Sequence, residues 1–191
     1  FARRAELQTE RVDAARLLKE LREILAHSLG GGITIRVEAA DGLVLSADKR
    51  QLETALINLA TNARDAMPSG GTLALSAAAD EIGEGANLGV RLGSGTYVRL
   101  SVADDGTGMD AAVLARASEP FFTTKPEGQG TGLGLAGARG FAEQSGGGLA
   151  IESASGRGTT VTLWFPAASD VPAAAAAERE TVAAERNAAA A

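Results

Sequence analysis

The chain has 191 residues, of which 45% are apolar and 4% aromatic, so one main domain with a core of Leu, Val, Ile and Ala is expected. Its formal net charge of −6 argues against a general binder of nucleic acid or anionic membranes, because such binding needs a basic face. The absence of cysteine excludes disulfides and thiolate metal sites. No apolar run approaches the ~20 residues of a membrane span, and the first residues do not resemble a signal peptide, so we expect a cytoplasmic protein without direct membrane contact.

The first half of the chain alternates between predicted helices and strands. Residues 1–11 are charged and helix-permissive and are predicted to be the end of a longer helix. Leucines then repeat at helical spacing from a predicted N-cap at Asp13 to Gly30. Alternation predicts a strand at 33–37 and a short one at 43–45, and Ser46 or Asp48 is expected to cap a helix over 49–67. A further strand is predicted at 72–76.

The second half of the chain begins with a predicted loop at 80–95 and a strand at 97–102. One or two helical turns are expected at 110–117, an irregular loop at 118–130 and a helix at 135–144. Two strands at 149–152 and 159–165 are joined by a glycine-containing turn. Residues 167–191 shift to Ala and Glu and predict a poorly ordered tail or interdomain linker. The pattern predicts an α+β domain with a mixed sheet of about five strands and helices on one face.

Glycines are densest in residues 128–148, where the run GTGLGL (residues 130–135) comes directly before the predicted helix. A glycine-rich turn that opens a helix suits phosphate, because backbone N–H groups can approach the anion and the helix N-terminus adds partial positive charge. Taken without context, a flexible surface loop is the alternative. A phosphate site would also need a metal ligand and a base pocket elsewhere in the chain.

Three polar residues share one stripe of the predicted helix 49–67. Asn58, Asn62 and Asp65 are spaced i, i+4 and i+7, while Leu52, Leu56, Leu59 and Ala63 form a separate apolar stripe for the core. Asn is a poor helix former, and its neutral carbonyl oxygen suits Mg²⁺ that is bound mainly by waters and substrate phosphates. An exposed polar face is an equally good interpretation of this stripe alone.

A short acidic motif, Asp104-Asp105-Gly106-Thr107-Gly108, directly follows an apolar strand. A carboxylate at a strand end can accept a hydrogen bond from an exocyclic amine such as that of adenine, and the glycines let the chain turn tightly beneath a flat ring. The alternative is an ordinary acidic β-turn, since this five-residue pattern is weak by itself.

A third motif, EPFFTTK (residues 119–125), precedes the glycine run. Its two adjacent phenylalanines are interpreted as anchors that hold a mobile lid by inserting into the core, and plain core packing is the alternative. Lys125 is one of three lysines in the chain and lies next to the proposed phosphate loop. Without that loop, a solvated surface charge would be the better interpretation of Lys125.

Taken together and in this order, the motifs resemble those of the catalytic and ATP-binding domain of sensor histidine kinases, in the GHKL-type ATPase superfamily that includes gyrase, Hsp90 and MutL. The asparagine helix resembles the N box, DDGTGM the G1 box, EPFFTTK the F box, GTGLGL the G2 box and GRGTTVTLWFP the last box. The resemblance covers about residues 1–166 and is strongest to the soluble PAS-linked and hybrid subgroup. It implies a two-layer α/β sandwich of the Bergerat type with a flexible ATP lid at about Ser118 to Thr131.

The resemblance also implies roles for individual residues. Asn62 would coordinate Mg²⁺, Asp104 would bind the adenine amine of ATP or ADP, and Lys125 would reach a phosphate. The implied catalytic residues are Asn58, Asn62 and Lys125. The implied nucleotide-binding residues are Asn62, Asp65, Ala66, Asp104, Gly106, Gly108, Met109, Thr123, Thr124, Lys125, Gly130, Thr131, Gly132, Leu133, Gly134, Leu135 and Thr159.

Two positions bear on the reaction: one on transfer versus hydrolysis, and the other on the phosphate acceptor. In the hydrolysing relatives, the residue one helical turn before the metal-binding asparagine is a Glu that activates water, whereas this chain has Asn58, which cannot act as a carboxylate base. The acceptor histidine of the family lies on the first dimerisation helix. The single histidine here, His27, lies in a leucine-rich helix without the expected acidic neighbour and is interpreted as a partly buried structural residue.

The resemblance therefore implies transfer of the ATP γ-phosphate to a histidine outside this chain. Residues 1–12 would end a dimerisation helix and linker, 13–166 would form the catalytic domain and 167–191 the tail. Implied partners are the histidine-bearing dimerisation helices, a response regulator or receiver domain, and a second copy in a homodimer, with no nucleic acid. The alternatives are an anti-sigma-type serine kinase, against which the expected helix at 1–11 argues, and a nucleotide-binding adaptor without catalysis.

Overall fold

The computed structural model describes residues 7–84, 89–126 and 130–168. Five of the strands form one sheet in the order β2-β4-β5-β7-β6, and the remaining two form a small antiparallel pair, β1-β3. In chain order, the elements of the described residues are β1 (Glu10–Asp13), α1 (Ala14–Ser28), β2 (Ile33–Ala39), β3 (Val44–Ala47), α2 (Lys49–Ala66), β4 (Gly71–Ile82), β5 (Gly95–Asp104), α3 (Ala111–Arg116), α4 (Gly134–Gln144), β6 (Gly148–Ser153) and β7 (Thr159–Pro166).

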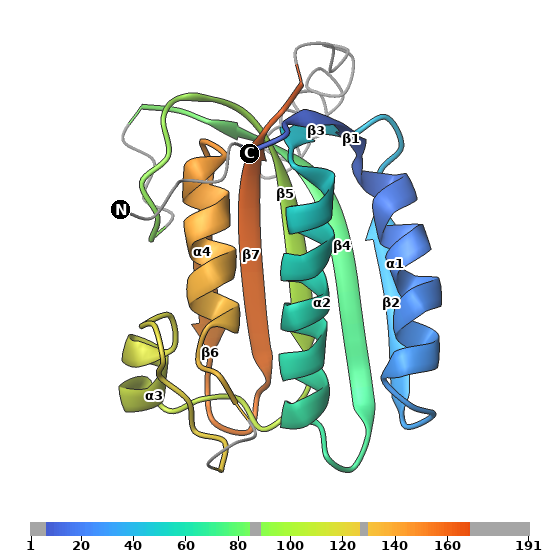
Figure 1. Ribbon diagram of the computed structural model, residues 1–191, viewed down its shortest axis with the longest axis vertical. Coiled ribbons are helices and arrows are strands. Elements are labelled where there is room, and N and C mark those ends of the chain that lie inside the picture. Colours follow the sequence, from blue (N-terminus) through green and yellow to red (C-terminus); the bar gives the residue numbers. More distant parts are fainter. Residues whose placement is uncertain (1–6, 85–88, 127–129, 169–191) are drawn as a thin grey trace, which may run out of the picture.

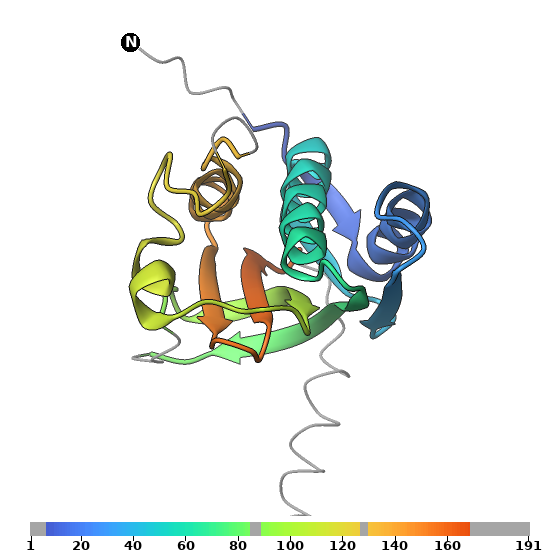
Figure 2. The ribbon, with the colours of Figure 1, turned by 90° about the horizontal axis from the view of Figure 1, so that it is seen from below.

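The large sheet is mixed. Strands β2 and β4 are parallel, and the pairs β4–β5, β5–β7 and β6–β7 are antiparallel. The helices α1, α2 and α4 lie side by side on one face of this sheet, as Figures 1 and 2 show. Within the described residues, the opposite face carries no helix (Figure 2). The predicted α+β fold, with about five strands and helices on one face, is confirmed.

Aspartates begin the two long helices. The Asp13 carboxylate accepts a hydrogen bond from the backbone N–H of Arg16 at 2.9 Å, which caps α1 as the sequence predicts. At α2, Asp48 rather than Ser46 is the cap, and its carboxylate accepts from the N–H of Gln51 at 3.1 Å. Each cap satisfies an N–H group of the first helical turn that has no partner within the helix.

The core lies between the helix layer and the sheet. The predicted apolar stripe of α2 is buried there, since Leu52, Leu56, Leu59 and Ala63 are each at most 4% exposed. Phe141 of α4 and Phe165 of β7 supply a tilted ring pair with centroids 5.4 Å apart. The fully buried leucines of the sheet are Leu73, Leu75, Leu100 and Leu163. The core is therefore built mainly from leucine, as the low aromatic content predicts.

The N-terminal segment departs from the sequence-based expectation. Within the predicted helix at 1–11, residues 1–6 lie outside the described residues, 7–9 have no regular structure and Glu10 begins strand β1. Strand β1 pairs with β3 through the register Val12 to Leu45, and Val12 is 3% exposed. The helical prediction is wrong for residues 7–11, because pairing with β3 and burial of Val12 outweigh the weak local helix propensity.

The β4–β5 hairpin is longer than its apolar residues suggest. Strand β4 continues from the expected 72–76 to Ile82, and β5 begins at Gly95, so part of the predicted loop at 80–95 is paired strand. In the loop that joins the two strands, Val90 and Leu92 pack against a cluster that contains Trp164. The Trp164 indole N–H donates to the Asp80 carboxylate at 2.9 Å, which secures β7 to β4 across the sheet. The extension was hidden because small residues such as Ala dominate this part of β4.

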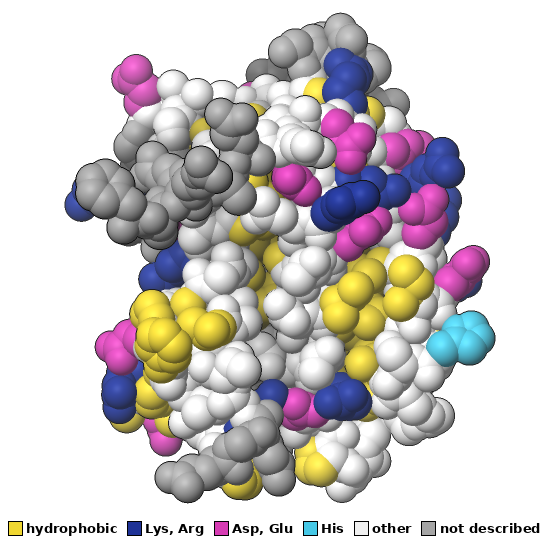
Figure 3. Space-filling model, in the orientation of Figure 1, with side chains coloured by type: hydrophobic (Ala, Val, Ile, Leu, Met, Phe, Trp, Pro, Cys, Tyr) yellow, Lys and Arg dark blue, Asp and Glu magenta, His cyan; other side chains and the backbone are white. Residues whose placement is uncertain are grey.

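Charged side chains gather over the N-terminal ends of α1 and α2, where Figure 3 shows acidic and basic groups intermixed. Glu20 pairs with Arg16 at 2.7 Å and with Lys49 at 3.4 Å. His27, in the last turn of α1, is exposed, and its Nδ1 lies 2.8 Å from the Glu23 carbonyl oxygen. The expectation of a partly buried histidine is therefore wrong, because the leucine face of α1 points to the core and His27 is on the other side.

Candidate functional site

A cavity of about 600 Å³ opens between the C-terminal half of α2, the start of α4 and the end of β5. This is within the size range of small-molecule and cofactor sites. All the site residues that the sequence predicts line this cavity except Gly106 and Leu133. The predicted residues that line it are Asn58, Asn62, Asp65, Ala66, Asp104, Gly108, Met109, Thr123, Thr124, Lys125, Gly130, Thr131, Gly132, Gly134, Leu135 and Thr159. Residues as far apart in the chain as Asn58 and Thr159 thus share one cavity.

The two exceptions have different positions. Gly106 lies behind the cavity wall, where a Cβ atom would come 2.5 Å from the carbonyl oxygen of Ala66. A side chain at this position would push the acidic turn away from α2. Leu133 is 45% exposed and directs its side chain to solvent rather than into the cavity. Leu133 is the N-cap residue of α4.

Asp104 is the last residue of the central strand β5. Strand pairing places it opposite Thr159 of β7, and its carboxylate accepts the backbone N–H of Gly106 at 2.9 Å. Burial raises the pKa of the Asp104 carboxyl, backbone hydrogen bonds from Gly106 and Thr159 offset part of the increase, and the neighbouring Asp105 adds to it. A half-buried acceptor is thereby held at one end of the cavity.

Apolar side chains also line the cavity that contains Asp104, and the sequence did not predict this role for most of them. Leu59 of α2, Val102 of β5, Val113 of α3 and Val161 of β7 line the cavity together with Phe122. These residues come from four different elements and one loop. Such a pocket, with apolar walls and one carboxylate, suits a flat base that carries an exocyclic amine. Only the period-2 pattern of β5 and β7 could have indicated which valines face this side of the sheet.

Ser153 is a further residue that the sequence analysis missed. Its hydroxyl accepts the N–H of Met109 at 2.8 Å, donates to the Gly158 carbonyl at 2.9 Å and lies 3.0 Å from the Thr159 hydroxyl. Ser153 thus joins the acidic turn that follows β5 to the hairpin between β6 and β7. Gly108 is adjacent to that hairpin with a φ of +64°, where a Cβ would collide with the carbonyl oxygen of Ala154. The hairpin therefore supports the acidic turn from behind.

The polar end of the cavity lies where α2 and α4 approach each other. A Cβ on Gly134, the first residue of α4, would come 3.6 Å from the Asn62 amide nitrogen and 3.8 Å from Asn58 Cβ. Helix α4 begins without a side-chain cap, and its first residues, Gly134 and Leu135, line this part of the cavity. The N–H groups of the first turn and the positive helix end are therefore close to it. The arrangement suits an anionic group between Asn58, Asn62 and the start of α4.

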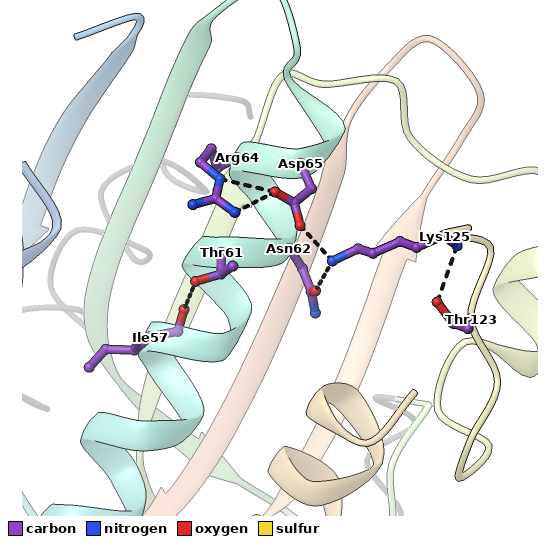
Figure 4. A network of polar contacts seen from close by, with 7 residues as sticks. All are labelled: Ile57, Thr61, Asn62, Arg64, Asp65, Thr123 and Lys125. Carbon is purple, nitrogen blue, oxygen red and sulfur yellow. Dashed lines mark hydrogen bonds and ion pairs between the residues drawn. The ribbon is translucent and has the colours of Figure 1, made fainter. Parts of the chain in front are cut away.

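A chain of polar contacts runs across this end of the cavity (Figure 4). The Lys125 ammonium donates to Asn62 Oδ1 at 3.2 Å and to Asp65 Oδ2 at 2.6 Å. Arg64 donates to the other Asp65 oxygen at 2.9 Å from Nε and at 2.7 Å from Nη2. Partial burial alone would raise the pKa of Asp65, but hydrogen bonds and charges from Lys125 and Arg64 hold that pKa below its ordinary value.

The two phenylalanines of EPFFTTK behave differently from each other. Phe121 is 76% exposed and has a φ of +67°, and its N–H donates to the Gly132 carbonyl at 2.9 Å. The prediction that both rings insert into the core is therefore wrong for Phe121. Close packing of Gly132 against the Phe121 backbone fixes the chain path and leaves the ring outside. Phe122 lies under the Arg116 guanidinium, 4.3 Å from the ring centroid, and lines the cavity.

The predicted lid at Ser118 to Thr131 is partly outside the described residues, because 127–129 are not described. Within the described residues, no group of three or more His, Cys, Asp and Glu side chains could hold a metal ion. Any metal held there would therefore depend on ligands such as the Asn62 amide and on a bound substrate. Among the described helices, none is long and apolar enough to cross a membrane.

Comparison with known proteins agrees with the geometry of the cavity, which suits a nucleotide. Residues 47–169 match the family described as "Histidine kinase-, DNA gyrase B-, and HSP90-like ATPase". Curated relatives include "Sensor kinase CckA" of Brucella abortus (strain 2308), 40% identical over 92% of this chain and 19% of its own length. Another is "Sensor histidine kinase ZraS" of Escherichia coli (strain K12), 38% identical over 70% of this chain and 26% of its own length. The chain therefore spans about a fifth to a quarter of these relatives.

Solved structures share the fold. The crystal structure of full-length ShkA in complex with AMPPNP superposes with a TM-score of 0.67 at 29% identity, over 87% of this chain and 32% of that one. A mycobacterial sensor histidine kinase, MprB, superposes with a TM-score of 0.64 at 23% identity, over 83% of this chain and 97% of that one. The chain belongs to the family of histidine kinase-, gyrase B- and HSP90-like ATPases. The prediction of a histidine-kinase-type ATP-binding domain is thus confirmed.

Proposed function

We propose that this domain binds ATP together with Mg²⁺ and transfers the γ-phosphate to a histidine nitrogen on a dimerisation domain of the same protein. The observation that supports this best is the shared cavity, which joins the Asp104 pocket to the asparagines of α2 and the start of α4. The base pocket, the candidate metal ligand and the phosphate site then follow one another along the cavity, in the order in which one bound nucleotide would contact them. The named sensor kinases among the relatives point to the same reaction.

At the base end, Asp104 would accept the adenine amine, with Thr159 and the backbone of the acidic turn beside it. At the phosphate end, the N–H groups of residues 130–135 and the start of α4 would hold the phosphates. Mg²⁺, when bound, would neutralise phosphate charge, and the neutral oxygen of Asn62 fits an ion that keeps most of its ligands as water and phosphate oxygens. The remaining work of the domain is to position the γ-phosphate for in-line attack.

Phosphotransfer is favoured over hydrolysis because neither carboxylate among the described lining residues is available to activate water. Of the described lining residues, only Asp65 and Asp104 are carboxylates. Asp65 is engaged by Arg64 and Lys125, and Asp104 lies at the base end. Asn58 occupies the position from which a carboxylate would activate water and cannot do so. In the proposed reaction, an imidazole nitrogen bonds to the γ-phosphorus while the bond to the ADP oxygen breaks, and ADP leaves.

The whole protein of which this domain would be part is proposed to work as a homodimer that passes its phosphate to a response regulator or receiver domain. His27 is exposed on α1 and does not line the cavity, so it is not the proposed acceptor. The serine-kinase alternative loses one counter-argument, because residues 10 and 11 form a strand and not a dimerisation helix. A direct test of the acceptor is therefore needed.

The first experiment is calorimetric titration of the chain with ADP and Mg²⁺, in parallel with Asp104→Ala. We expect the variant to lose roughly 5-fold or more in affinity, since an unpaired amine in a half-buried pocket costs ~1–3 kcal/mol. The same variant should lose preference for ATP over GTP, while Asp41→Ala on an exposed turn should change neither property. Equal ADP affinity in wild type and Asp104→Ala would reject the base pocket.

The acceptor is tested by incubating the chain with radiolabelled ATP and either a histidine-bearing dimerisation fragment of a related kinase or a serine-bearing anti-sigma antagonist. We expect acid-labile label on the first and none on the second, because phosphohistidine is lost in acid and phosphoserine is not. Label on serine would support the serine-kinase alternative. ADP binding without transfer to either would support an adaptor.

A further inference from the structure

Lys125 is the only lysine that lines the cavity among the described residues, and it is already bound there to protein atoms. Its ammonium lies 3.2 Å from Asn62 Oδ1 and 2.6 Å from Asp65 Oδ2, and the two partners are 63 and 60 residues away in the sequence. Its own backbone N–H donates to the Thr123 hydroxyl at 3.1 Å, which turns the loop so that the side chain extends to α2 (Figure 4). The contact is therefore part of the local fold of the loop.

Asp65 makes this contact specific. Arg64 occupies one carboxylate oxygen with two N–H groups, which leaves the other oxygen for the Lys125 ammonium. Charge-assisted hydrogen bonds of this kind are the stronger ones, and here the side chains of Lys125 and Asp65 are each 31% exposed. Asp65 thus holds the ammonium beside the Asn62 amide oxygen, which by itself attracts a cation only weakly.

The atom that Lys125 contacts is the same oxygen that the proposed function assigns to Mg²⁺. An ammonium within hydrogen-bond distance of an amide oxygen repels a second cation at that oxygen, and the repulsion is stronger in a partly buried site than in water. A divalent ion could coordinate Asn62 only after the ammonium moves away. Lys125 and the metal therefore compete for one ligand.

We propose that Lys125 is an internal cation that occupies the Asn62 oxygen until Mg²⁺ and nucleotide arrive, and that Asp65 is the positioning residue that keeps it there. This inference rests on the proposed Mg²⁺–nucleotide site. The exchange releases the ammonium from Asn62 while its loop keeps it at the phosphate end of the cavity.

The test is a set of calorimetric titrations with ADP, each done once with Mg²⁺ and once with EDTA. The measured quantity is the ADP dissociation constant in EDTA divided by the ADP dissociation constant in Mg²⁺. A larger ratio means that Mg²⁺ promotes nucleotide binding more strongly. In Lys125→Met this ratio should rise roughly 5-fold or more above wild type, because Mg²⁺ no longer displaces an ammonium. Lys49→Met is the matched control, since Lys49 pairs with Glu20 and Glu53 on the surface and should leave the ratio unchanged.

A second pair of variants separates competition at Asn62 from competition at the phosphates. In an Asp65→Asn background, Lys125→Met should change the ratio by no more than roughly 2-fold, because the ammonium is no longer held beside Asn62. An undiminished effect in that background would mean that Lys125 competes for phosphate oxygens alone, and would overturn the proposal. An unchanged or lower ratio in Lys125→Met would overturn it as well.

Failure of the underlying function looks different from failure of the exchange. If wild type does not bind ADP with Mg²⁺, or if Asn62→Ala keeps the full Mg²⁺ effect, the proposed site itself is rejected. A nucleotide-free readout adds an independent check: the side-chain amide resonances of Asn62 should shift in Lys125→Met and not in Lys49→Met. Absence of that shift would contradict the contact on which the exchange depends.

Discussion

Asp104, the proposed base-binding residue, carries a cost to stability. Burial, with the charge of Asp105, raises the pKa of its carboxyl despite the hydrogen bonds from Gly106 and Thr159. The folded state therefore binds this proton more tightly than the unfolded state does. Its contribution to stability is fully present below the ordinary Asp pKa of about 4 and is lost as the pH rises through the raised pKa of the folded protein.

Asp104→Asn should accordingly raise the thermal midpoint of the nucleotide-free protein at pH 7 and lower its ADP affinity. The gain in midpoint should shrink as the pH falls toward about 4, where the wild-type carboxyl is also neutral. Thermal unfolding at several pH values measures this, with Asp41→Asn on an exposed turn as the control. A midpoint gain that does not depend on pH would contradict the assigned cause.

We expect a substitution of Asn58 to change the reaction type. Asn58 is exposed to the cavity and lies close to the start of α4, with its Cβ 3.8 Å from a Cβ built on Gly134. Asn58→Glu should increase phosphate release from ATP in the absence of an acceptor by roughly 10-fold or more, since a positioned general base contributes ~10²–10⁴-fold. Asn58→Gln, which lacks the carboxylate, is the control in a coupled phosphate assay. Equal rates in the two variants would argue against Asn58 as the position of a latent base.

At the scale of elements, the β6–β7 hairpin positions the acidic turn that follows β5. Ser153 contacts both Met109 and Gly158, and the Gly156 N–H donates to the Thr107 carbonyl at 2.7 Å. The acidic turn is thus held by a hairpin nearly 50 residues later in the chain. Its conformation therefore depends on tertiary contacts as well as on its own two glycines.

Ser153→Ala should therefore weaken ADP binding as well as stability. We expect a loss of ~1 kcal/mol in unfolding free energy for the unpaired Met109 N–H, and a several-fold loss in affinity because the turn that carries Asp104 is less well held. Calorimetry with ADP and denaturant unfolding measure the two effects. The exposed Ser155 in the same hairpin gives the control variant, Ser155→Ala. Reduced stability with unchanged affinity would limit Ser153 to a structural role.

For the whole molecule, stability depends on one leucine-rich layer between the helices and the sheet. Leu100 lies at the centre of it, fully buried on strand β5, whose last residue is Asp104. Leu100→Ala should cost ~2–5 kcal/mol in unfolding free energy, because it removes apolar contacts and leaves a cavity. ADP and Mg²⁺ at 100 times the dissociation constant should restore ~2.7 kcal/mol if the site remains intact.

Thermal unfolding with and without nucleotide measures both quantities. Ser101→Ala, on the other face of the same strand, is the control and should cost less than ~1 kcal/mol. If nucleotide did not stabilise Leu100→Ala, the expectation that the nucleotide site survives this substitution would be wrong. The site would then depend on the packing of the core around Leu100.

The order of the motifs, the caps at Asp13 and Asp48, the leucine stripes and the alternating strands could all be predicted from the sequence, because each depends on residues within a few positions of one another. Together with the family resemblance, these features were sufficient to predict the fold class and most of the polar and glycine residues that line the cavity, but not most of its apolar walls. They could not predict strand β1, the exposed ring of Phe121, the link through Ser153 or the ion pair between Lys125 and Asp65. Each of these depends on a partner between 11 and 60 residues away, and only tertiary packing decides whether such a partner is within reach.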